Sequence, residues 1–386
     1  MCAVGPVSAP CNCDSRRQGH LRSLTCTQTK NKKTKTQQQR TTPMTLKRLI
    51  TTFAAGITAA GLTASAALAQ TELTYSSWIP WSHPVNLNIY IPWIEAIEKE
   101  SEGRITFKRL PKPVSSPPAA LDAVRTGQAD VSFSVHGYAR KQFTAYLFAE
   151  LPLMGDSAEA TSIALQRTHD KFLADKDLYK GVHLVGMMMH GPGQVHHTKK
   201  LIESPADMEG QKMRTGGPIP MAITEAWGGV SIRQPSSKSY EILSSGIADG
   251  IMFPYESVTS FNLTNVTKYS TNVPGGWYSS SHFLFINQRA YDKLPDEDKA
   301  IIDKYSGEAF AKLAGHGWDV INTKGLEDLK ANGNTIVDAS PALMSAITEL
   351  RDGFLADYYV AAEAEGVDGK AMYAYFKAQM AELTAE

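Results

Sequence analysis

One short pattern of a helix, a glycine and a strand occurs twice in the chain. The first copy is Leu121-Asp-Ala-Val-Arg-Thr-Gly127-Gln-Ala-Asp130-Val-Ser-Phe-Ser134, and the second is Ile242-Leu-Ser-Ser-Gly246-Ile-Ala-Asp249-Gly-Ile-Met-Phe253. Each copy predicts a short helix, a glycine that ends it in a left-handed conformation, and a strand that follows Gly-x-Ala-Asp. Two ordinary helix-to-strand joins would look the same. The repeat nevertheless favours two related lobes with a ligand between them at the strand ends.

The apolar residues elsewhere show the same alternation of strands and helices. Residues 73–77 and 105–110 are typical of strands, and residues 86–102 are typical of a helix because their apolar positions recur three or four apart. Residues 342–386 have a helical pattern that should break at three glycines: Gly353, Gly366 and Gly369. This alternation of strands and helices predicts an α/β protein built on largely parallel sheets.

The charged residues divide the chain into two unlike parts. Of the 39 basic and 39 acidic residues, ten basic residues and one acidic residue lie in 1–69, which leaves 29 basic and 38 acidic residues in 70–386. The longer part therefore has a net charge of −9, and we expect no nucleic-acid partner because a basic excess is lacking. All four cysteines lie in 1–69, so the longer part has no thiol nucleophile.

Residues 1–69 combine a polar leader with an export signal. Residues 1–43 are basic and rich in Thr and Gln, and we interpret them as disordered or untranslated. After Met44, a short positive region precedes an apolar run that ends in an Ala-x-Ala cleavage sequence. We therefore expect residues 44–69 to be a signal peptide that is cut after Ala69. The alternative is a membrane anchor, for which 49–69 would be just long enough.

A search for catalytic signatures gives little. The sequence has no G-x-S-x-G nucleophile elbow, no H-E-x-x-H motif and no G-x-x-x-x-G-K-[ST] phosphate loop. His190, His196 and His197 lie close together in sequence, but neighbouring histidines on a strand point to opposite faces, and no carboxylate or cysteine joins them at ligand spacing. We expect surface or rim histidines here, and no metal site or cofactor.

Arg214 is the most informative charged residue. It should end a short strand just before the turn formed by Thr215-Gly-Gly-Pro218, and a helix should follow. An arginine at such a strand end can hold a carboxylate through two parallel hydrogen bonds. Most arginines are solvated surface residues, and that alternative stays open.

Aromatic residues at strand ends supply the other half of a candidate pocket. Three groups follow strands or lie in loops: Trp78 and Trp81; Phe253, Tyr255 and Glu256; and Trp277 and Tyr278. Packing in the core is the alternative for each aromatic residue. Three such groups at loop positions favour a cleft that they line together.

Several motifs then match a known family in their order and spacing. Glu102-Gly103-Arg104-Ile105 is similar to "tgGri", Ala206-Asp-Met-Glu-Gly-Gln-Lys-Met-Arg214 to "aDlkGlkmR", and residues 240–250 to "y.aLq.GviDG". Weaker matches occur at 120–135, 148–154, 227–230 and 287–295. Together these motifs resemble the solute-binding proteins of the tripartite ATP-independent periplasmic (TRAP) transporters, the DctP-like family. The resemblance covers essentially all of residues 70–386.

The resemblance implies a fold and a division of the chain. The fold would be that of a two-lobed periplasmic binding protein (type II-like), in which each lobe is a sheet flanked by helices and a long C-terminal helix completes the molecule. We expect residues 70–191 and 279–320 to form lobe I, and residues 192–278 and 321–386 to form lobe II.

The resemblance also implies a ligand site. Arg214 would hold the ligand carboxylate, and Gln194 falls where the family often places a second polar contact. Trp78 and Phe253 stand where the family commonly has polar residues, which disfavours sugar acids and favours a compact carboxylate with an apolar, aromatic or cationic remainder. The expected ligand-binding residues are Arg214, Gln194, Trp78, Phe253, Tyr255, Glu256, His136 and Trp277.

The expected function is therefore transport rather than catalysis. A periplasmic protein, monomeric or dimeric, would close its lobes around a small organic acid and deliver it to the membrane permease subunits of a TRAP transporter. Three alternatives stay open. The ligand could be a zwitterionic compatible solute in an aromatic cage; the chain could be a secreted hydrolase with an unrecognised acid–histidine–hydroxyl site; or it could be an anchored structural protein.

Overall fold

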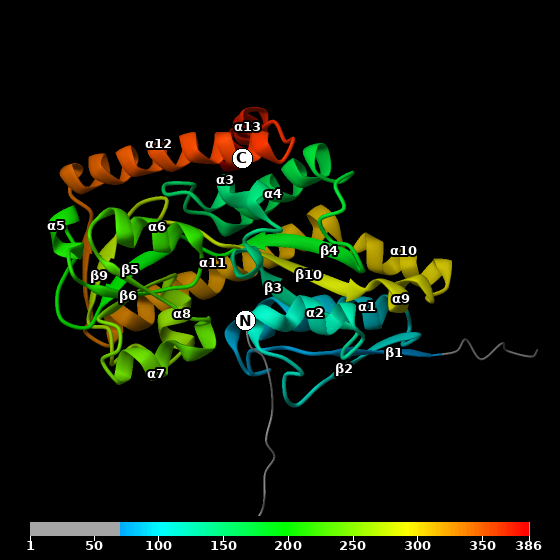
Figure 1. The fold of residues 1–386 in the computed structure, drawn as a ribbon. Helices are drawn as coiled ribbons and strands as arrows, with labels where there is room; N and C mark the ends of the chain where they lie inside the picture. The colour runs from blue at the N-terminus through cyan, green and yellow to red at the C-terminus, as the bar shows by residue number, and fades with distance from the viewer. Residues whose placement is uncertain (1–69, 386) are drawn as a thin grey trace, which may run out of the picture. The chain divides into compact units, whose positions relative to one another are not determined.

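The computed structural model describes residues 70–385, whose strands form two sheets (Figure 1). The first sheet has the order β2-β1-β3-β10-β4 and is made of β1 (Thr71–Tyr75), β2 (Ile105–Arg109), β3 (Val131–Val135), β4 (Val182–Met189) and β10 (Ser281–Asn287). The second has the order β11-β9-β5-β8-β6-β7 and is made of β5 (Gln194–His197), β6 (Lys212–Thr215), β7 (Val230–Arg233), β8 (Gly250–Phe253), β9 (Tyr269–Asn272) and β11 (Thr335–Asp338). The expected leader, 1–43, and signal peptide, 44–69, lie outside the described residues.

Both sheets are mixed rather than purely parallel. In the first sheet β1 is parallel to β2 and β3, whereas β10 runs antiparallel between β3 and β4. In the second sheet β6 is parallel to β7 and β8, β9 is parallel to β11, and β5 is antiparallel to both β8 and β9. The two antiparallel strands, β5 and β10, each follow a direct passage of the chain from the other sheet. Such a passage lacks the crossover helix that returns a chain in the parallel direction.

Helices surround both sheets. The shorter ones are α1 (Ile91–Glu100), α2 (Ala120–Arg125), α3 (Leu147–Glu150), α5 (Pro205–Met208), α6 (Pro218–Ala226), α7 (Ser239–Ser244), α8 (Tyr255–Ser260), α9 (Gln288–Asp292) and α10 (Asp296–Lys304). The longer ones are α4 (Ala158–Phe172), α11 (Gly307–Ala331), α12 (Pro341–Ala364) and α13 (Gly369–Ala385). α11 packs against α4, next to the first sheet, and against α8, next to the second. Over residues 70–385 none of these helices combines the length and the apolarity needed to cross a membrane.

The repeated pattern has the predicted structure. α2 ends at Arg125, just before Gly127, and α7 ends at Ser244, just before Gly246. Both glycines have positive φ angles, of +79° and +72°, and the strands β3 and β8 follow them. One copy lies in each sheet, as a two-lobed fold requires, and the relation between the lobes stays a prediction. The helix expected from Asn86 begins as a π-helical turn, Asn86–Tyr90, and continues as α1.

The predicted breaks in the C-terminal helices are partly wrong. Gly366, with a φ of +68°, interrupts the helical stretch and Gly369 begins α13, as expected. Gly353, in contrast, lies inside α12, which runs through it without a break. A single interior glycine costs a helix only about 1 kcal/mol, which is less than the packing of a 24-residue helix supplies.

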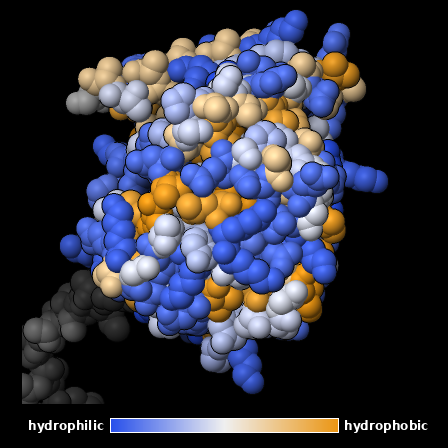
Figure 2. All heavy atoms as spheres, turned by 90° about the vertical axis from the view of Figure 1, so that its left-hand side faces the viewer, coloured by the Kyte–Doolittle hydropathy of each residue, from blue (hydrophilic) through white to orange (hydrophobic). Residues whose placement is uncertain are grey.

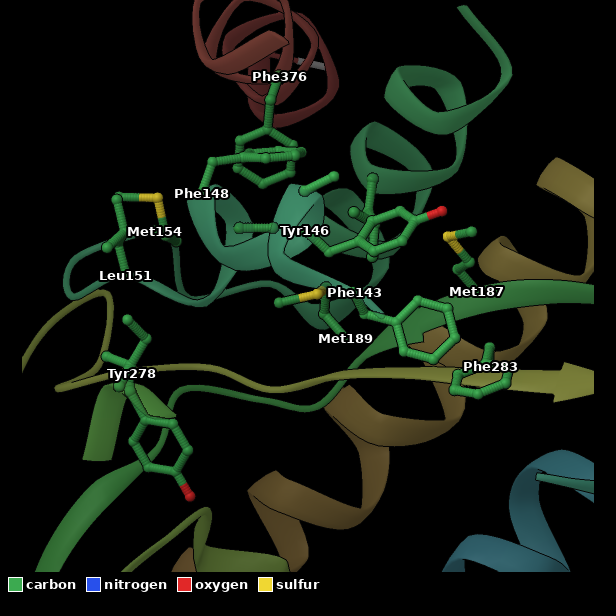
Figure 3. Packing of buried hydrophobic residues seen from close by; sticks show 14 of the residues in the cluster. Phe143, Tyr146, Phe148, Leu151, Met154, Met187, Met189, Tyr278, Phe283 and Phe376 are labelled. Atoms are coloured by element: carbon green, nitrogen blue, oxygen red, sulfur yellow. The ribbon is translucent and has the colours of Figure 1, made fainter. Parts of the chain in front are cut away.

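The core beneath the C-terminal helix joins distant parts of the chain (Figure 3). Phe148 of α3 packs edge-on against Phe376 of α13 at 5.2 Å, and Phe143 lies 5.2 Å from Phe283 of β10, between ring centroids. α13 also packs along α4. The assignment of 70–191 with 279–320 to one lobe and 192–278 with 321–386 to the other stays a prediction.

The outer face at the α5–α7 end of the molecule is mostly hydrophilic, with hydrophobic side chains gathered in a band across its middle (Figure 2). The polar side chains that are candidates for function lie instead inside the molecule, between the two sheets.

Candidate functional site

A cavity lies between the two sheets and is lined from both. The cavity volume is about 60 Å³. A single water molecule needs about 10–15 Å³ of such volume. The cavity walls therefore enclose room for a compact molecule. Seven of the twenty lining residues are aromatic: Trp78, Phe133, Tyr138, Phe253, Phe261, Tyr278 and Trp318.

Arg214 brings a positive charge to this cavity. It lies on β6 and is only 2% exposed. Its Nε and Nη2 atoms donate hydrogen bonds to the Gln234 carbonyl, at 3.0 and 2.7 Å, and the guanidinium carbon lies 4.7 Å from the centroid of the Phe253 ring. These bonds use two of the five guanidinium N–H groups, so three are left, two of them on Nη1.

Arg214 has no acidic partner in the part of the chain that the structure describes. Among residues 70–385, no carboxylate oxygen lies within 4.0 Å of the Arg214 nitrogens. Burial lowers the pKa of Arg214, while the neighbouring Tyr138 and Tyr278 act in the opposite direction. Buried charges are ordinarily paired, and this guanidinium keeps N–H groups that no protein group within residues 70–385 accepts. A Cβ at Gly216 would lie 3.1 Å from both Nη atoms, which explains why the turn after β6 has no side chain there.

Glu256 is the acidic residue that lines the cavity. It lies in the first turn of α8, is 1% exposed, and its Oε2 accepts a hydrogen bond from Ser257 Oγ at 2.8 Å. Its Oε1 has no hydrogen-bond partner and lies 3.7 Å from Nδ1 of His83. Burial raises the pKa of Glu256 to about 7, because it disfavours the ionised carboxylate.

The cavity histidines are held neutral. Burial lowers the pKa values of His83 and His190 to about 4 and that of His282 to about 3. All three histidines line the cavity. The charge that a ligand meets there is therefore that of Arg214, offset in part by Glu256 near neutral pH.

The structure brings four of the eight predicted site residues to the cavity, namely Arg214, Trp78, Phe253 and Glu256. Trp78 packs against Phe133 with ring centroids 4.5 Å apart, and its Nε1 donates to the Phe133 carbonyl at 2.9 Å.

The other four predicted residues lie elsewhere, where protein groups engage them. Gln194 is buried in β5 and bonds the Val273 backbone in both directions, at 2.8 and 3.0 Å. The Tyr255 hydroxyl donates to Asn272 Oδ1 at 3.0 Å. His136 bonds Ser281 and Tyr179, and Trp277 packs against Trp227 at 5.4 Å and donates to the Thr271 carbonyl. Their role in ligand binding stays a prediction, which this placement does not favour.

The expectation of surface histidines at positions 190, 196 and 197 is wrong. All three are more than nine-tenths buried. The ring of His196 bonds Ser270 Oγ at 2.8 Å and the Phe253 carbonyl at 3.0 Å, which compensates the loss of water. Over residues 70–385, no three His, Cys, Asp or Glu side chains gather closely enough to hold a metal ion.

Several residues that line the cavity were not predicted as site residues from the sequence: His83, Tyr138, His190, His282 and Trp318. Tyr138 follows the first Gly-x-Ala-Asp strand just as Glu256 follows the second, so the repeat contained a signal for it. Trp318 lies within the long helix α11 and nothing in its sequence context distinguishes it from a core residue.

Two sheets, a cavity lined from both of them, and a buried arginine with no acidic partner among residues 70–385 are the features of a two-lobed solute-binding protein. The comparison with known families agrees, because residues 76–360 match the model of the bacterial extracellular solute-binding protein family 7, DctP. The chain belongs to this family and is a TRAP solute-binding protein.

Solved structures of similar proteins share the fold. A TRAP periplasmic solute-binding protein from Bordetella bronchiseptica, with bound (R)- and (S)-mandelate, is 40% identical, with a TM-score of 0.79 over 81% of this chain and 99% of that one. A marine metagenome TRAP solute-binding protein specific for aromatic acid ligands, in complex with metahydroxyphenylacetate, is 32% identical, with a TM-score of 0.77 over 81% and 99%. The curated relative TsaT of Comamonas testosteroni, described as an outer membrane transporter protein, is 27% identical over 80% of this chain and 91% of its own length.

Proposed function

We propose that the protein captures a small aromatic carboxylate in the cavity between its sheets. The observation that carries this proposal is Arg214, a buried guanidinium with free N–H groups, no acidic partner and an aromatic ring beneath it. A carboxylate would supply the missing negative charge and accept the free N–H groups through two parallel bonds. The aromatic walls would cover the apolar part of such a ligand.

The similar proteins support this ligand class. The Bordetella bronchiseptica protein has bound mandelate, and the marine protein is specific for aromatic acids. A further TRAP protein, from Rhodoferax ferrireducens, was crystallised with copurified benzoate and is 25% identical over 82% of this chain. The anion receptor and the aromatic walls of the cavity fit molecules of this kind.

We further infer that the protein acts outside the cytoplasm and passes its ligand to TRAP membrane permease subunits. Family membership supports this role, together with the expected signal peptide at 44–69 and its cleavage after Ala69. The intact mass of the protein purified from its native host should correspond to a chain that begins at Gln70. A mass that still includes 44–69 would contradict the cleavage.

We infer binding without catalysis. Ser257, Glu256 and His83 resemble a hydrolase triad in composition, but the glutamate lies between the other two, with Ser257 Oγ 2.8 Å from Oε2 and His83 Nδ1 3.7 Å from Oε1. In a triad the histidine lies between the acid and the serine, because it has to take the hydroxyl proton. This order of contacts therefore supports a polar binding surface.

The test is a ligand panel measured by thermal shift and calorimetry on the purified protein. Benzoate, phenylacetate and mandelate, or acids like them, should raise the melting temperature by several degrees at saturating concentration. Arg214→Ala should weaken binding at least 100-fold, about 3 kcal/mol, because it removes a charge-assisted pair. Arg233→Ala is the matched control, since Arg233 lies exposed on the neighbouring strand β7.

Two results would contradict the proposal. If no carboxylate stabilises the protein, the cavity is not an acid receptor. If Arg214→Ala binds the acids as tightly as the unchanged protein does, the receptor lies elsewhere. A zwitterion such as a betaine that binds more tightly than every simple acid would favour the aromatic-cage alternative.

A further inference from the structure

Three polar atoms in the cavity wall have no hydrogen-bond partner among residues 70–385. They are Oε1 of Glu256, Nε2 of His83 and Nε1 of Trp318. Their side chains are at least nine-tenths buried and all line the cavity. An unpaired buried polar atom is costly, and three that line one cavity point to a ligand that pairs with them.

Each of the three atoms has a defined hydrogen-bonding role. Nδ1 of His83 accepts a hydrogen bond from the Val85 backbone N–H at 3.2 Å. The neutral ring therefore carries its proton on Nε2, which is a donor. Trp318 Nε1 can only donate. Glu256 Oε1 is a carboxyl oxygen whose partner atom, Oε2, is already engaged by Ser257. The cavity therefore presents two donors and one carboxyl oxygen.

The three residues come from separate parts of the fold that meet here. His83 precedes the helix that begins at Asn86, and Glu256 begins α8. Trp318 lies on α11, one helical turn before Asn322, whose Oδ1 accepts a hydrogen bond from the Glu256 backbone N–H at 3.3 Å. The long helix α11 thus brings Trp318 to the same side as the start of α8.

An aromatic path connects Arg214 with these residues. The guanidinium lies over Phe253, Phe253 packs against Phe261 at 5.6 Å, and Phe261 contacts the ring of His83 at 5.3 Å. No Arg214 nitrogen lies within 4.0 Å of a Glu256 oxygen, so the two polar ends are distinct. A ligand that reaches both ends has to present an apolar middle to this path.

The hydrogen-bonding pattern discriminates between candidate ligand groups. A hydroxyl accepts from the N–H donors and donates to the glutamate, so it satisfies both kinds of group. An ammonium has no acceptor and would leave both N–H donors unpaired. A bare ring would leave all three atoms unpaired.

We propose that Glu256, His83 and Trp318 form a subsite for a hydroxyl group, so that the ligand is an aromatic acid with a hydroxyl away from its carboxylate. This inference rests on the proposed function, because Arg214 has to hold the carboxylate at the other end. It assigns the second polar contact of the ligand to residues from three separate parts of the chain that line the same cavity.

The test compares parent acids with their hydroxylated forms by calorimetry on the purified protein. The probes are benzoate against 3- and 4-hydroxybenzoate, and phenylacetate against its 3- and 4-hydroxy forms. At least one hydroxylated acid should bind about tenfold more tightly than its parent. Trp318→Phe, which removes one N–H and keeps a ring, should reduce that preference at least threefold, and the readout is the ratio of the two affinities because the smaller ring also covers less of the parent acid.

Trp81→Phe is the matched control. Its Nε1 donates to the Leu110 carbonyl at 2.8 Å and the residue does not line the cavity, so this variant should keep the full preference. Glu256→Gln provides a second variant and should also reduce the preference.

The outcomes separate this inference from the proposed function. If the parent acids bind and no hydroxylated form binds better, the subsite is wrong and the acid receptor stands. If the preference survives in both Trp318→Phe and Glu256→Gln, the hydroxyl binds elsewhere and the assignment is wrong. Tighter binding of 3-(aminomethyl)benzoate, which carries an ammonium, would also overturn it. If none of the acids binds, the proposed function fails and the inference fails with it.

Discussion

Two buried polar regions of the molecule have similar composition but differ in their hydrogen bonds. The polar atoms of one are paired within the protein, and several polar atoms of the other are not. The closed network consists of Glu150, Ser281, His136, Tyr179, Tyr146 and His169. The open site consists of Arg214, Glu256, His83 and Trp318. Burial raises the pKa of the glutamate in each region to about 7 and lowers the pKa values of the histidines in both.

The regions differ in how their polar atoms are paired. In the closed network Ser281 donates to Glu150 Oε1 at 2.6 Å, His136 bonds Ser281 at 2.9 Å and Tyr179 at 2.6 Å, and Tyr146 bonds His169 at 2.9 Å. None of these side chains has a fully buried polar atom without a partner, whereas three residues of the open site do. A shifted pKa reports burial in both regions, and the two regions differ in the pairing of their polar atoms.

The largest expected difference between the regions is in stability. His136→Leu should lower the free energy of unfolding by about 3–4 kcal/mol, because it removes two buried hydrogen bonds and leaves the Tyr179 hydroxyl unpaired. His83→Leu should cost only about 1 kcal/mol, because its ring accepts one backbone hydrogen bond and has a free Nε2. Denaturant unfolding of the two variants at one pH measures the contrast. Equal losses would show that the two regions do not differ in the way that their hydrogen bonds indicate.

The next difference concerns the two glutamates and pH. Each has a pKa of about 7 in the folded protein. The ordinary glutamate pKa, which applies to the unfolded chain, is 4.5. Between these values the folded protein holds a proton that the unfolded chain has lost, so stability falls as pH rises from about 4.5 to about 7. Each glutamate accounts for roughly 3 kcal/mol of this fall when it is complete. Between pH 5 and pH 8, the free energy of unfolding should fall by about 2–3 kcal/mol less in Glu150→Gln than in the unchanged protein. The same difference is expected for Glu256→Gln.

A bound ligand should separate the two glutamates. The acid that binds most tightly in the panel contacts the open site, so it should change the pH dependence of stability in the unchanged protein and in Glu150→Gln. In Glu256→Gln the same acid should add a stabilisation that is nearly independent of pH. Unfolding curves at several pH values, with and without the acid, test this. A pH-dependent ligand effect that persists in Glu256→Gln would mean that another group titrates in the cavity.

Much of the fold could be predicted from the sequence because its signals are local. The Gly-x-Ala-Asp repeat specified two helix-to-strand joins, and the pattern around Arg214 placed it at the end of a short strand before a turn and a helix. The antiparallel strands β5 and β10 were not predicted, because their direction depends on the passage of the chain between the sheets. No local pattern encodes that passage.

The site was predicted only in part for the same reason. Arg214, Trp78, Phe253 and Glu256 follow strands or end them, and strand ends meet at the cavity. Gln194 and Trp277 also lie at strand ends or in loops. Their polar groups, however, donate hydrogen bonds to the backbone carbonyls of Val273 and Thr271. Whether a polar side chain is satisfied by the protein or free for a ligand depends on contacts between distant residues, which the sequence pattern does not show.

The smallest expected difference compares two tryptophans, one at the open site and one in the core. Trp78→Phe should weaken the binding of aromatic acids about three- to fivefold, because Trp78 lines the cavity over Phe133 and a phenyl ring covers less of the ligand. Trp277→Phe should leave affinity unchanged, since Trp277 is fully buried against Trp227 and does not line the cavity. It should instead lower the melting temperature, because the Thr271 carbonyl loses its donor. Calorimetry with benzoate and thermal unfolding of both variants give the two readouts. A loss of affinity in Trp277→Phe alone would return Trp277 to the ligand site and show that pairing within the protein does not exclude a residue from binding.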